Sequence, residues 1–394
     1  MVITPLLAGN VARNCHPLGC QRQLEQQLQQ LAAIGPIATP KRVLILGGSS
    51  GLGLAARLVC AFAGGADTYS LAIERPPRDG QPGSAGYYQQ QHLTRLAQER
   101  GLGAWDHLGD LFAAETLQQV CDQVRATLGQ IDLVIYSVAS GRRQADGQLW
   151  QSVLKPIGAA IEGQSLRLEP LGVVAERVEP ATAAEVNATI KVMGGEPWHQ
   201  WLEALLAADL LAPGARTLAF SYIGPDWTAP IYRHGTIGVA KEHLHASANQ
   251  LNERLTTAIG GSAHAVVCQA LITKASVFIP LLSSYLAALH AVLEEGEGDE
   301  GPLGQMVRLF RDRLGPQVVT DEDRLIRLDD KELAREVQQA VAIRLAGLTP
   351  DNAQERLQLT RFRSAFLQLF GFGVDGVDYQ QPLPAELLLA DANR

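Results

Sequence analysis

The sequence predicts an α/β fold in which a doubly wound parallel sheet is covered by helices on both faces. Short apolar runs such as 43–46 and 131–136 alternate with helical patterns of 10–15 residues, as in consecutive βαβ units. A glycine-rich turn at 47–53 directly follows the first of these runs. Hydrophobic residues make up 46% of the 394-residue chain and charged residues 19%, a balance that allows a large core and excludes a disordered chain or a coiled coil.

Strands and helices alternate regularly from residue 41 to about residue 140. The strands are short runs rich in aliphatic residues, and the helices carry apolar residues at helical spacing. A polar loop of turn-forming residues, 76–86, interrupts the alternation. The predicted elements are strands at 43–46, 69–73, near 105 and at 131–136, with helices from after Gly53 to about 62, about 93–100 and about 115–128.

The second half is less regular, and no linker rich in Pro, Gly or Ser divides it from the first. We therefore expect one large domain over residues 1–394, with insertions on the substrate side at about 141–200 and 276–330. Helices dominate from residue 276 onward. The predicted elements are a hairpin at 166–180, helices at 184–193 and 198–208, a strand at 217–222, a helix from 236 to about 257, a strand at 263–271 and an apolar helix at 278–293.

The overall charge and the cysteines exclude several classes of protein. With 33 basic and 41 acidic side chains the formal net charge is −8, so no basic field favours nucleic acid or an anionic membrane. No apolar run reaches the roughly 18 residues of a membrane-spanning helix, and residues 1–10 lack the charged region of a signal peptide. Five cysteines without a CxxC pair suggest neither a disulfide framework nor a zinc site. We expect a cytoplasmic enzyme without a metal, a nucleic-acid partner or stable membrane insertion.

The glycine-rich turn is typical of a dinucleotide-binding site. Gly47, Gly51 and Gly53 lie between a strand and a helix, where glycines let the backbone approach a pyrophosphate and helix N-terminal amides favour its charge. A plain tight turn in any α/β protein is the alternative. Glu74 lies at the end of the second strand, where a carboxylate can accept hydrogen bonds from the adenosine ribose.

Glu74 favours NADH over NADPH, because its charge would repel a 2′-phosphate. Arg75 follows directly and could pair with such a phosphate, which moderates the preference. A solvated charge at the end of a strand is the alternative interpretation of Glu74.

A tyrosine and a lysine nine residues apart form the candidate catalytic pair. Tyr232 and Lys241 are about half a turn out of phase at 100° per residue, so they cannot share one face of a straight helix. Tyr232 is therefore expected in the loop before a helix that has Thr236 as its N-cap. Gly235 and Gly238 allow the chain to bend tightly there. The alternative is a buried structural tyrosine and a surface lysine.

Ordered motifs extend from the start of the chain to its end. They include HPLGC at 16–20, YSVAS at 136–140, SVLKPIG at 152–158, KVMGGE at 191–196, SYIGP at 221–225, PIY at 230–232, GTIGVAKEHL at 235–244, FGF at 370–372 and VDY at 377–379. In this order they resemble trans-2-enoyl-CoA reductases, a family whose bacterial members also act as enoyl-acyl-carrier-protein reductases and carry a Tyr-x8-Lys motif. The resemblance implies an enlarged, Rossmann-type short-chain-dehydrogenase fold with a helical C-terminal part, NADH as the cofactor, and a monomer.

The resemblance also assigns roles to individual residues. Tyr232 is the family's proton-donor position and Tyr222 its substrate-binding position. Lys241 would orient the nicotinamide ribose and, as a cation, lower the pKa of the tyrosine. Two positions depart from the family pattern: Leu52 replaces a common tyrosine, and Gly141-Arg142 replaces a usual Pro-Val. The implied cofactor contacts are Gly47, Gly48, Ser49, Ser50, Gly51, Leu52, Ile73, Glu74, Asp110, Leu111, Val138, Ala139, Lys241, Leu271, Ile272 and Thr273.

Other polar groups have both functional and plainer interpretations. Asp110 would accept from the adenine amino group, or it caps the entry to a helix. The pair Arg142-Arg143, with Lys155, meets the phosphates of CoA or phosphopantetheine, or forms a solvated patch. His243 and His245 lie on different faces of one predicted helix, so they do not form a helical metal chelate.

The implied reaction is the NADH-dependent reduction of the C2–C3 double bond of a trans-2-enoyl thioester, the last step of the fatty-acid elongation cycle. The substrate is an enoyl-CoA or an enoyl-acyl-carrier protein. Negative charge collects on the thioester oxygen, where Tyr232 and Tyr222 would donate hydrogen bonds, and protonation at C2 completes the turnover. The apolar stretch 278–293 is a candidate wall for the acyl chain. The alternatives are carbonyl reduction by a short-chain dehydrogenase and a regulatory protein that binds NAD(H) without turnover.

Overall fold

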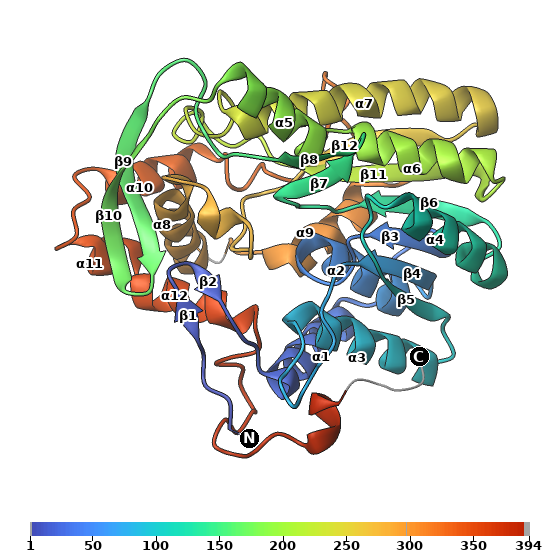
Figure 1. Cartoon of the computed structure of the whole chain (residues 1–394), viewed down its shortest axis with the longest axis horizontal. Helices are drawn as coiled ribbons and strands as arrows, with labels where there is room; N and C mark the ends of the chain where they lie inside the picture. Colours follow the sequence, from blue (N-terminus) through green and yellow to red (C-terminus); the bar gives the residue numbers. More distant parts are fainter. Residues whose placement is uncertain (1, 297, 390–394) are drawn as a thin grey trace.

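A seven-stranded parallel sheet forms the centre of the protein in the computed structural model, which describes residues 2–296 and 298–389 (Figure 1). Adjacent strands all run parallel, in the spatial order β13-β12-β11-β6-β3-β4-β5. This confirms the predicted doubly wound parallel sheet. The strands are β3 (Arg42–Leu46), β4 (Asp67–Ala72), β5 (Ala104–Leu108), β6 (Ile131–Tyr136), β11 (Leu211–Ser221), β12 (Ser262–Val267) and β13 (Ile326–Arg327).

The strand order reverses between β3 and β6, in the middle of the sheet. The chain runs outward from β3 to β4 and β5, then returns to the other side of β3 as β6 and continues through β11, β12 and β13. In open parallel sheets, the crevice outside the carboxyl ends of the strands at such a reversal is where dinucleotides bind. The topology therefore indicates that a dinucleotide would bind between the loops that follow β3 and β6, the nucleotide crevice of such folds.

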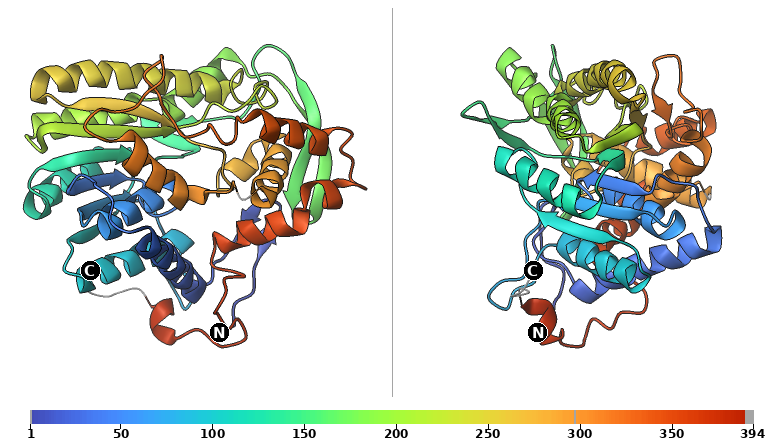
Figure 2. Two further views of the ribbon diagram at one scale, coloured as in Figure 1. Left: turned by 180° about the vertical axis from the view of Figure 1, so that it is seen from behind. Right: turned by 90° about the vertical axis from the view of Figure 1, so that its right-hand side faces the viewer.

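Alternate residues of the central strands face two separate helical layers (Figure 2). In β3, Val43 and Ile45 pack with α1, α2 and α9, whereas Leu44 and Leu46 pack with α4, α6 and α7. All four side chains are fully buried, as expected for a parallel sheet covered on both faces. The helices are α1 (Pro17–Ile34), α2 (Gly51–Leu58), α9 (Gly301–Arg308), α4 (Ala114–Thr127), α6 (Glu196–Ala207) and α7 (Thr236–Ile259).

A second packed region, formed by a β-hairpin and the C-terminal helices, lies beside the sheet. Figure 2 shows the green hairpin next to the orange and red helices. Helix α8 is buried along most of its length, because the hairpin and three other helices surround it. The predicted hairpin is confirmed, and the helix predicted at 278–293 spans Leu282–Glu295. The elements are β9 (Ile161–Leu168), β10 (Leu171–Val178), α8 (Leu282–Glu295), α10 (Arg335–Leu345), α11 (Ala353–Leu357) and α12 (Leu359–Gln368).

Smaller elements complete the fold. No helix within the described residues is both long and apolar enough to cross a membrane. The remaining elements are the hairpin β1 (Leu7–Ala8) and β2 (Val11–Ala12), α3 (Ala85–Glu99), the hairpin β7 (Arg142–Ala145) and β8 (Gln148–Gln151), α5 (Ala183–Met193), π-helical turns at Val59–Ala63 and Leu309–Arg313, and 3₁₀ turns at Ser276–Phe278 and Ala385–Leu388.

The turn between β1 and β2 is hydrogen-bonded to the second packed region. The buried amide of Asn10 donates from Nδ2 to the carbonyl oxygens of Leu166, at 3.0 Å, and Val277, at 2.9 Å. Its Oδ1 accepts from the backbone N–H of Leu168 at 2.9 Å. One side chain thus joins β9 to the segment that precedes α8.

Several predicted element boundaries are wrong; strand β11, for example, begins at Leu211 rather than at residue 217. Helix α3 begins at Ala85 rather than at about residue 93, because aromatic side chains of its first turn pack into the core. Strand β12 ends at Val267 rather than at residue 271, where the chain turns out of the sheet. The N-cap of α7 is Gly235 rather than Thr236. The Thr236 hydroxyl instead donates to the carbonyl oxygen of Val153 at 2.5 Å.

Candidate active site

The predicted site residues gather at one edge of the sheet. Parallel strands end at a common edge, so their following loops come together although they are far apart in the sequence. Lys241 is the exception, because it reaches this edge from the first turns of α7. The others follow the strands in turn: Gly47–Leu52 after β3, Ile73 and Glu74 after β4, Asp110 and Leu111 after β5, Val138 and Ala139 after β6, Tyr222 and Tyr232 after β11, and Leu271–Thr273 after β12.

The glycine turn after β3 is too closely packed to hold side chains. Gly47 has a φ of +95°, and a Cβ there would lie 2.0 Å from the carbonyl oxygen of Ser137. A Cβ on Gly53 would lie 2.1 Å from the carbonyl oxygen of Gly47. At the N-cap of α2, the Ser50 side chain makes no capping hydrogen bond within the described part of the chain. The first amides of α2 therefore remain available for an anion, which fits a pyrophosphate.

Glu74 lies directly beside this turn. Its Oε1 accepts a hydrogen bond from the hydroxyl of Ser49, a buried residue of the glycine turn, at 2.7 Å. Gly86 in α3 packs directly against the Glu74 carboxylate, since a Cβ there would lie 2.0 Å from the same carboxylate oxygen. The neighbouring Ile73 is 78% exposed, which leaves its side chain free for contact with a nucleotide. Glu74 is therefore held at the end of β4, against the glycine turn.

Two further predicted contacts sit in ordered loops. Asp110 is exposed, and its Oδ1 accepts from the backbone N–H of Phe112 at 3.0 Å, so it stabilises a turn before α4 rather than the N-cap of that helix. Ser276 ties the loop after β12 together. Its Oγ accepts from the N–H of Thr273 at 2.9 Å and donates to the carbonyl oxygen of Leu271 at 2.8 Å.

Tyr222 and Tyr232 meet edge to face at the end of β11. Their ring centroids are 4.7 Å apart and the ring planes are inclined by 86°. Tyr232 lies in the turns before α7, as predicted, and is only 4% exposed. Burial, and then the nearby Glu332 carboxylate, raise the pKa of both phenols. Both hydroxyls are therefore protonated at neutral pH and can act as hydrogen-bond donors.

The expected lowering of the pKa of Tyr232 by Lys241 is absent from this structure, because burial and a carboxylate dominate its surroundings. Two glycines hold Tyr232 close to α7, as expected from the sequence. A Cβ on Gly235 would lie 2.2 Å from the carbonyl oxygen of Ile231. A Cβ on Gly238 would lie 2.4 Å from that of Tyr232.

Lys241 points from α7 toward the end of β11. Its Nζ donates to the carbonyl oxygen of Phe220 at 3.4 Å. Burial lowers the pKa of Lys241 to about 8, and the nearby Cys268 partly opposes this. Cys268 is itself buried in the sheet-facing core. Lys241 is thus a largely desolvated amine at the nucleotide crevice, not a surface lysine.

A buried carboxylate, Glu332, completes the tyrosine cluster. It is 0% exposed, and its Oε1 accepts hydrogen bonds from the hydroxyls of Tyr222 and Tyr285, each at 2.7 Å. Its Oε2 accepts from the backbone N–H of Ala270 at 2.6 Å. No sequence signal marks Glu332, which belongs to a run of charged residues, Asp329–Glu332, that is typical of a solvated surface.

The predicted phosphate-binding basic group is not assembled. Arg143 is only 3% exposed, and its guanidinium donates to the carbonyl oxygen of Lys191 at 2.8 Å and to Glu196 at 3.3 Å. Lys155 pairs with Glu185 at 2.5 Å. Only Arg142 of the predicted group is exposed. The prediction fails because tertiary contacts bury Arg143, which the sequence pattern alone presents as a surface residue.

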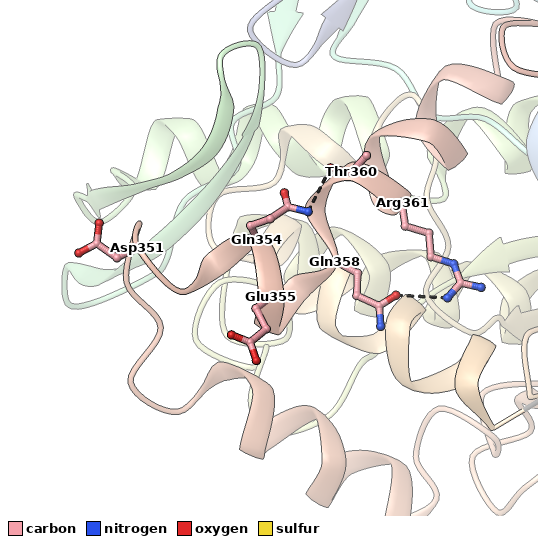
Figure 3. Close-up of a pocket in the computed structure, with 6 residues that line it drawn as sticks. All are labelled: Asp351, Gln354, Glu355, Gln358, Thr360 and Arg361. Carbon is pink, nitrogen blue, oxygen red and sulfur yellow. Dashed lines mark hydrogen bonds between the residues drawn. The ribbon is translucent and has the colours of Figure 1, made fainter.

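The remaining polar features lie outside this cluster. His243 accepts from the N–H of Gly195 at 3.1 Å, and His245 lies 2.8 Å from the hydroxyl of Ser221, so both histidines are hydrogen-bonded within the fold. Figure 3 shows a surface pocket on α11 and α12. Its lining is polar and shares no residue with the nucleotide turn or the tyrosine cluster: Asp351, Gln354, Glu355, Gln358, Thr360 and Arg361.

The strand order, the glycine turn and the tyrosine cluster together describe a Rossmann-type oxidoreductase that uses a nicotinamide dinucleotide. Comparison with known proteins narrows this class. Residues 81–315 match the family model of the trans-2-enoyl-CoA reductase catalytic region, and residues 2–79 match that of the NAD(P)H binding domain of trans-2-enoyl-CoA reductase. The chain belongs to the trans-2-enoyl-CoA reductase family.

Individual members of the family align with this chain over almost their whole length. An enoyl-[acyl-carrier-protein] reductase [NADH] of Vibrio cholerae is 44% identical over 97% of this chain and 97% of its own. One of Methylobacillus flagellatus is 41% identical over 98% of each chain. The crystal structure of Clostridium acetobutylicum trans-2-enoyl-CoA reductase with NADH superimposes with a TM-score of 0.95 at 36% identity, over 98% of this chain and 99% of the other.

A third family model, described as an enoyl reductase FAD binding domain, matches residues 320–383. This segment does not fit a flavin dinucleotide. Within residues 320–383, all of which the structure describes, the only strand is β13, and no glycine turn leads from it into a helix. The inward-facing side chains of its helices, such as Phe362 and Phe366, are packed into the core around α8. What the segment brings to the site is Glu332.

Proposed function

We propose that this protein reduces the C2–C3 double bond of trans-2-enoyl thioesters with NADH, and that Tyr232, Tyr222 and Lys241 form its catalytic centre. The observation that supports these roles most directly is the contact between the buried Tyr232 and the partly buried Tyr222, both protonated, beside the nucleotide crevice. Family membership gives the reaction class, and the relatives named above give NADH as the cofactor and enoyl-acyl-carrier protein as one substrate.

Each group has a defined task in this reaction. NADH, when bound, supplies the hydride that adds to C3. The hydroxyl of Tyr232 donates a hydrogen bond to the thioester oxygen, where negative charge develops. Tyr222, whose ring packs against that of Tyr232, donates a second hydrogen bond to the same oxygen. Tyr232, directly or through a water, then delivers the proton to C2. The glycine turn, Glu74 and Lys241 hold the dinucleotide, and Lys241 binds its nicotinamide ribose.

The buried face of α8 supports a role for this helix in enclosing the substrate. Tyr285 of α8 reaches the tyrosine cluster through Glu332, so the helix packs directly behind the reacting groups. Its apolar residues pack in the same cluster as Tyr232. We propose α8 as the wall of the acyl site. A single domain with substrate-side insertions, a monomeric state and a cytoplasmic location remain predictions.

The proposed activity is tested by measuring NADH oxidation by the purified protein. We expect turnover with crotonyl-CoA and with crotonyl-acyl-carrier protein, and none with a β-ketoacyl thioester. Matched kinetics with the two crotonyl thioesters show which carrier is preferred. Turnover of the β-ketoacyl thioester alone would favour the carbonyl-reductase alternative, and no turnover of any thioester would favour a regulatory protein.

Cofactor preference is expected to depend on Glu74. The unmodified enzyme should use NADH much better than NADPH, because the Glu74 carboxylate accepts from the ribose and repels a 2′-phosphate. Replacing Glu74 by Ala removes a charged carboxylate that accepts hydrogen bonds from the ribose. We therefore expect the Kd of NADH to rise about tenfold, or about 1.4 kcal/mol, and the preference for NADH over NADPH to become smaller. Glu74→Gln is the matched control, since it keeps an acceptor oxygen and removes only the charge. Equal kcat/KM for both nucleotides in the unmodified enzyme would contradict this assignment.

A further inference from the structure

The hydrogen bonds around Glu332 constrain what the hydroxyl of Tyr222 can do. A phenol carries one proton, and in this structure Tyr222 directs it to Oε1 of Glu332 at 2.7 Å. An ionised carboxylate only accepts hydrogen bonds, so the proton of Tyr222 is committed to Glu332 whenever Glu332 is charged. In that state Tyr222 cannot also donate to a thioester oxygen.

A neutral Glu332 reverses this arrangement. The N–H of Ala270 points at Oε2, at 2.6 Å, and occupies that oxygen as an acceptor. The acid proton is then placed on Oε1, which faces Tyr222 and Tyr285. From there it can be donated to the oxygen of Tyr222, whose own proton is released for a second partner.

We propose that Glu332 is a positioning residue that acts through Tyr222: in its neutral form it frees the Tyr222 hydroxyl to donate to the substrate oxygen, and in its ionised form it withdraws that donor. This inference rests on the proposed function of the site. No bond to the substrate forms or breaks at Glu332. Its two forms differ by one proton, which is exchanged with the solvent, and by the direction of the hydrogen bond between Glu332 and Tyr222.

The surroundings of Glu332 place this change near physiological pH. Burial raises the pKa of Glu332 to about 7, although hydrogen bonds from the Ala270 amide and the two tyrosines oppose the rise. The charge of Asp329 raises it further. The polar groups that face Glu332 are Tyr222, Tyr232, Tyr285 of α8, Asp329 and Gln338 of α10. The amide of Gln338 donates to the backbone carbonyl oxygen of Glu332 at 2.7 Å.

The nearby cations are engaged elsewhere. Arg327 pairs with Asp329 at 2.6 Å and with Asp321 at 3.1 Å. Lys331 pairs with Glu300 at 2.7 Å. Within the described residues, no ion pair to Glu332 itself is found. The carboxyl group is therefore not fixed in its charged form by a partner cation.

The sign of the pH dependence follows from this arrangement. Glu332 is neutral below its pKa, so Tyr222 is available as a donor at lower pH and is withdrawn as the pH rises. About one unit above a pKa of about 7, roughly a tenth of the carboxyl groups are neutral. At saturating NADH, which removes the effect of pH on NADH binding through Lys241, we therefore expect kcat/KM for crotonyl-CoA to fall roughly fivefold to tenfold between about pH 6 and about pH 8.

Glu332→Gln tests the inference directly. The N–H of Ala270 requires an oxygen opposite it, so the amide NH₂ of glutamine faces the tyrosines and mimics the neutral acid. We expect this variant to keep kcat/KM within about threefold of the unmodified enzyme at about pH 6 and to lose the decline toward about pH 8. Its Kd for NADH should be unchanged, because glutamine keeps the oxygen that accepts from the N–H of Ala270, next to the predicted cofactor contacts Leu271–Thr273.

Two further variants keep the test decisive if Glu332→Gln folds poorly. Tyr285→Phe removes one of the two donors to Oε1, which raises the pKa of Glu332 and should move the decline to higher pH without abolishing it. Tyr222→Phe removes the hydroxyl that Glu332 controls and should abolish the decline. Infrared difference spectra give a readout independent of turnover: a protonated carboxyl band should titrate over the same pH range and be missing in Glu332→Gln.

The outcomes separate this inference from the proposed function. If the unmodified enzyme turns over crotonyl-CoA but Glu332→Gln and Tyr222→Phe both retain its pH profile, Glu332 has only a structural role and the inference is wrong. A carboxyl band that does not titrate between about pH 6 and about pH 8 has the same meaning. If the unmodified enzyme turns over no enoyl thioester, the proposed function itself is wrong.

Discussion

Tyr232→Phe should lower kcat for crotonyl-CoA about 10²- to 10³-fold, as removal of one donor to a developing oxyanion does in other enzymes. The change removes only the hydroxyl of a ring that is 4% exposed and already packed against Tyr222, so the fold should be preserved. The Kd of NADH should stay the same, because the dinucleotide rests on the glycine turn, Glu74 and Lys241. Steady-state kinetics and NADH titration of the same preparation measure both quantities.

Two other tyrosines provide the comparison for this result. Tyr69→Phe changes an equally buried tyrosine in β4 and should leave kcat unchanged. Tyr222→Phe should affect KM more than kcat if its contact is equally strong in the ground state and the transition state. Near-normal turnover by Tyr232→Phe would move the proton-donor role elsewhere, first to Tyr222, and would leave the fold assignment intact.

Lys241→Met is expected to weaken NADH binding and to lower turnover together. A hydrogen bond from a charged amine contributes about 1.5–3 kcal/mol, so the Kd of NADH should rise roughly tenfold to a hundredfold. The pKa of Lys241 is lowered to about 8, and the cation that binds the ribose exists below that value. In the unmodified enzyme NADH affinity should therefore fall as the pH rises through about 8, and this dependence should be missing in the variant.

Lys41→Met is the matched control for this prediction. Lys41 also donates to a backbone carbonyl oxygen, that of Gly64 at 2.5 Å, but it lies before the amino end of β3, away from the crevice. Its replacement should leave the Kd of NADH unchanged. Unchanged NADH affinity and unchanged turnover in Lys241→Met would show that Lys241 has no part in the site.

The parts of the site that the sequence predicts well depend on local constraints. A glycine turn between an apolar run and a helical pattern indicates where backbone must approach backbone. Gly47 and Gly53 confirm this, because a Cβ on either residue would lie 2.0 or 2.1 Å from a carbonyl oxygen. The half-turn offset between Tyr232 and Lys241 follows from helix geometry alone, and it places Tyr232 before α7. Such inferences need no knowledge of distant contacts.

The parts that the sequence does not predict depend on contacts between distant segments. Glu332 meets Tyr222, 110 positions away, and Tyr285, 47 positions away, and nothing in its charged neighbourhood indicates burial. Arg143 is similar, because its partner Glu196 is 53 positions distant. A charged side chain in a polar run is usually solvated, so only the tertiary structure reveals the exceptions.

The hydrogen bonds of Asn10 affect the order in which parts of the protein can fold during synthesis. This residue is made before the backbone groups it binds, which lie 156 and 267 positions later. Contacts over such separations form late in folding, because the entropy of closing a long loop is lost before the contacts stabilise the folded chain. The strands up to β6 can associate during synthesis, whereas Asn10 can join the hairpin β9–β10 to the segment before α8 only after residue 277 has been made. The nascent protein would thus hold the glycine turn and Glu74 in place before it contains Lys241 or the helix proposed to enclose the acyl chain.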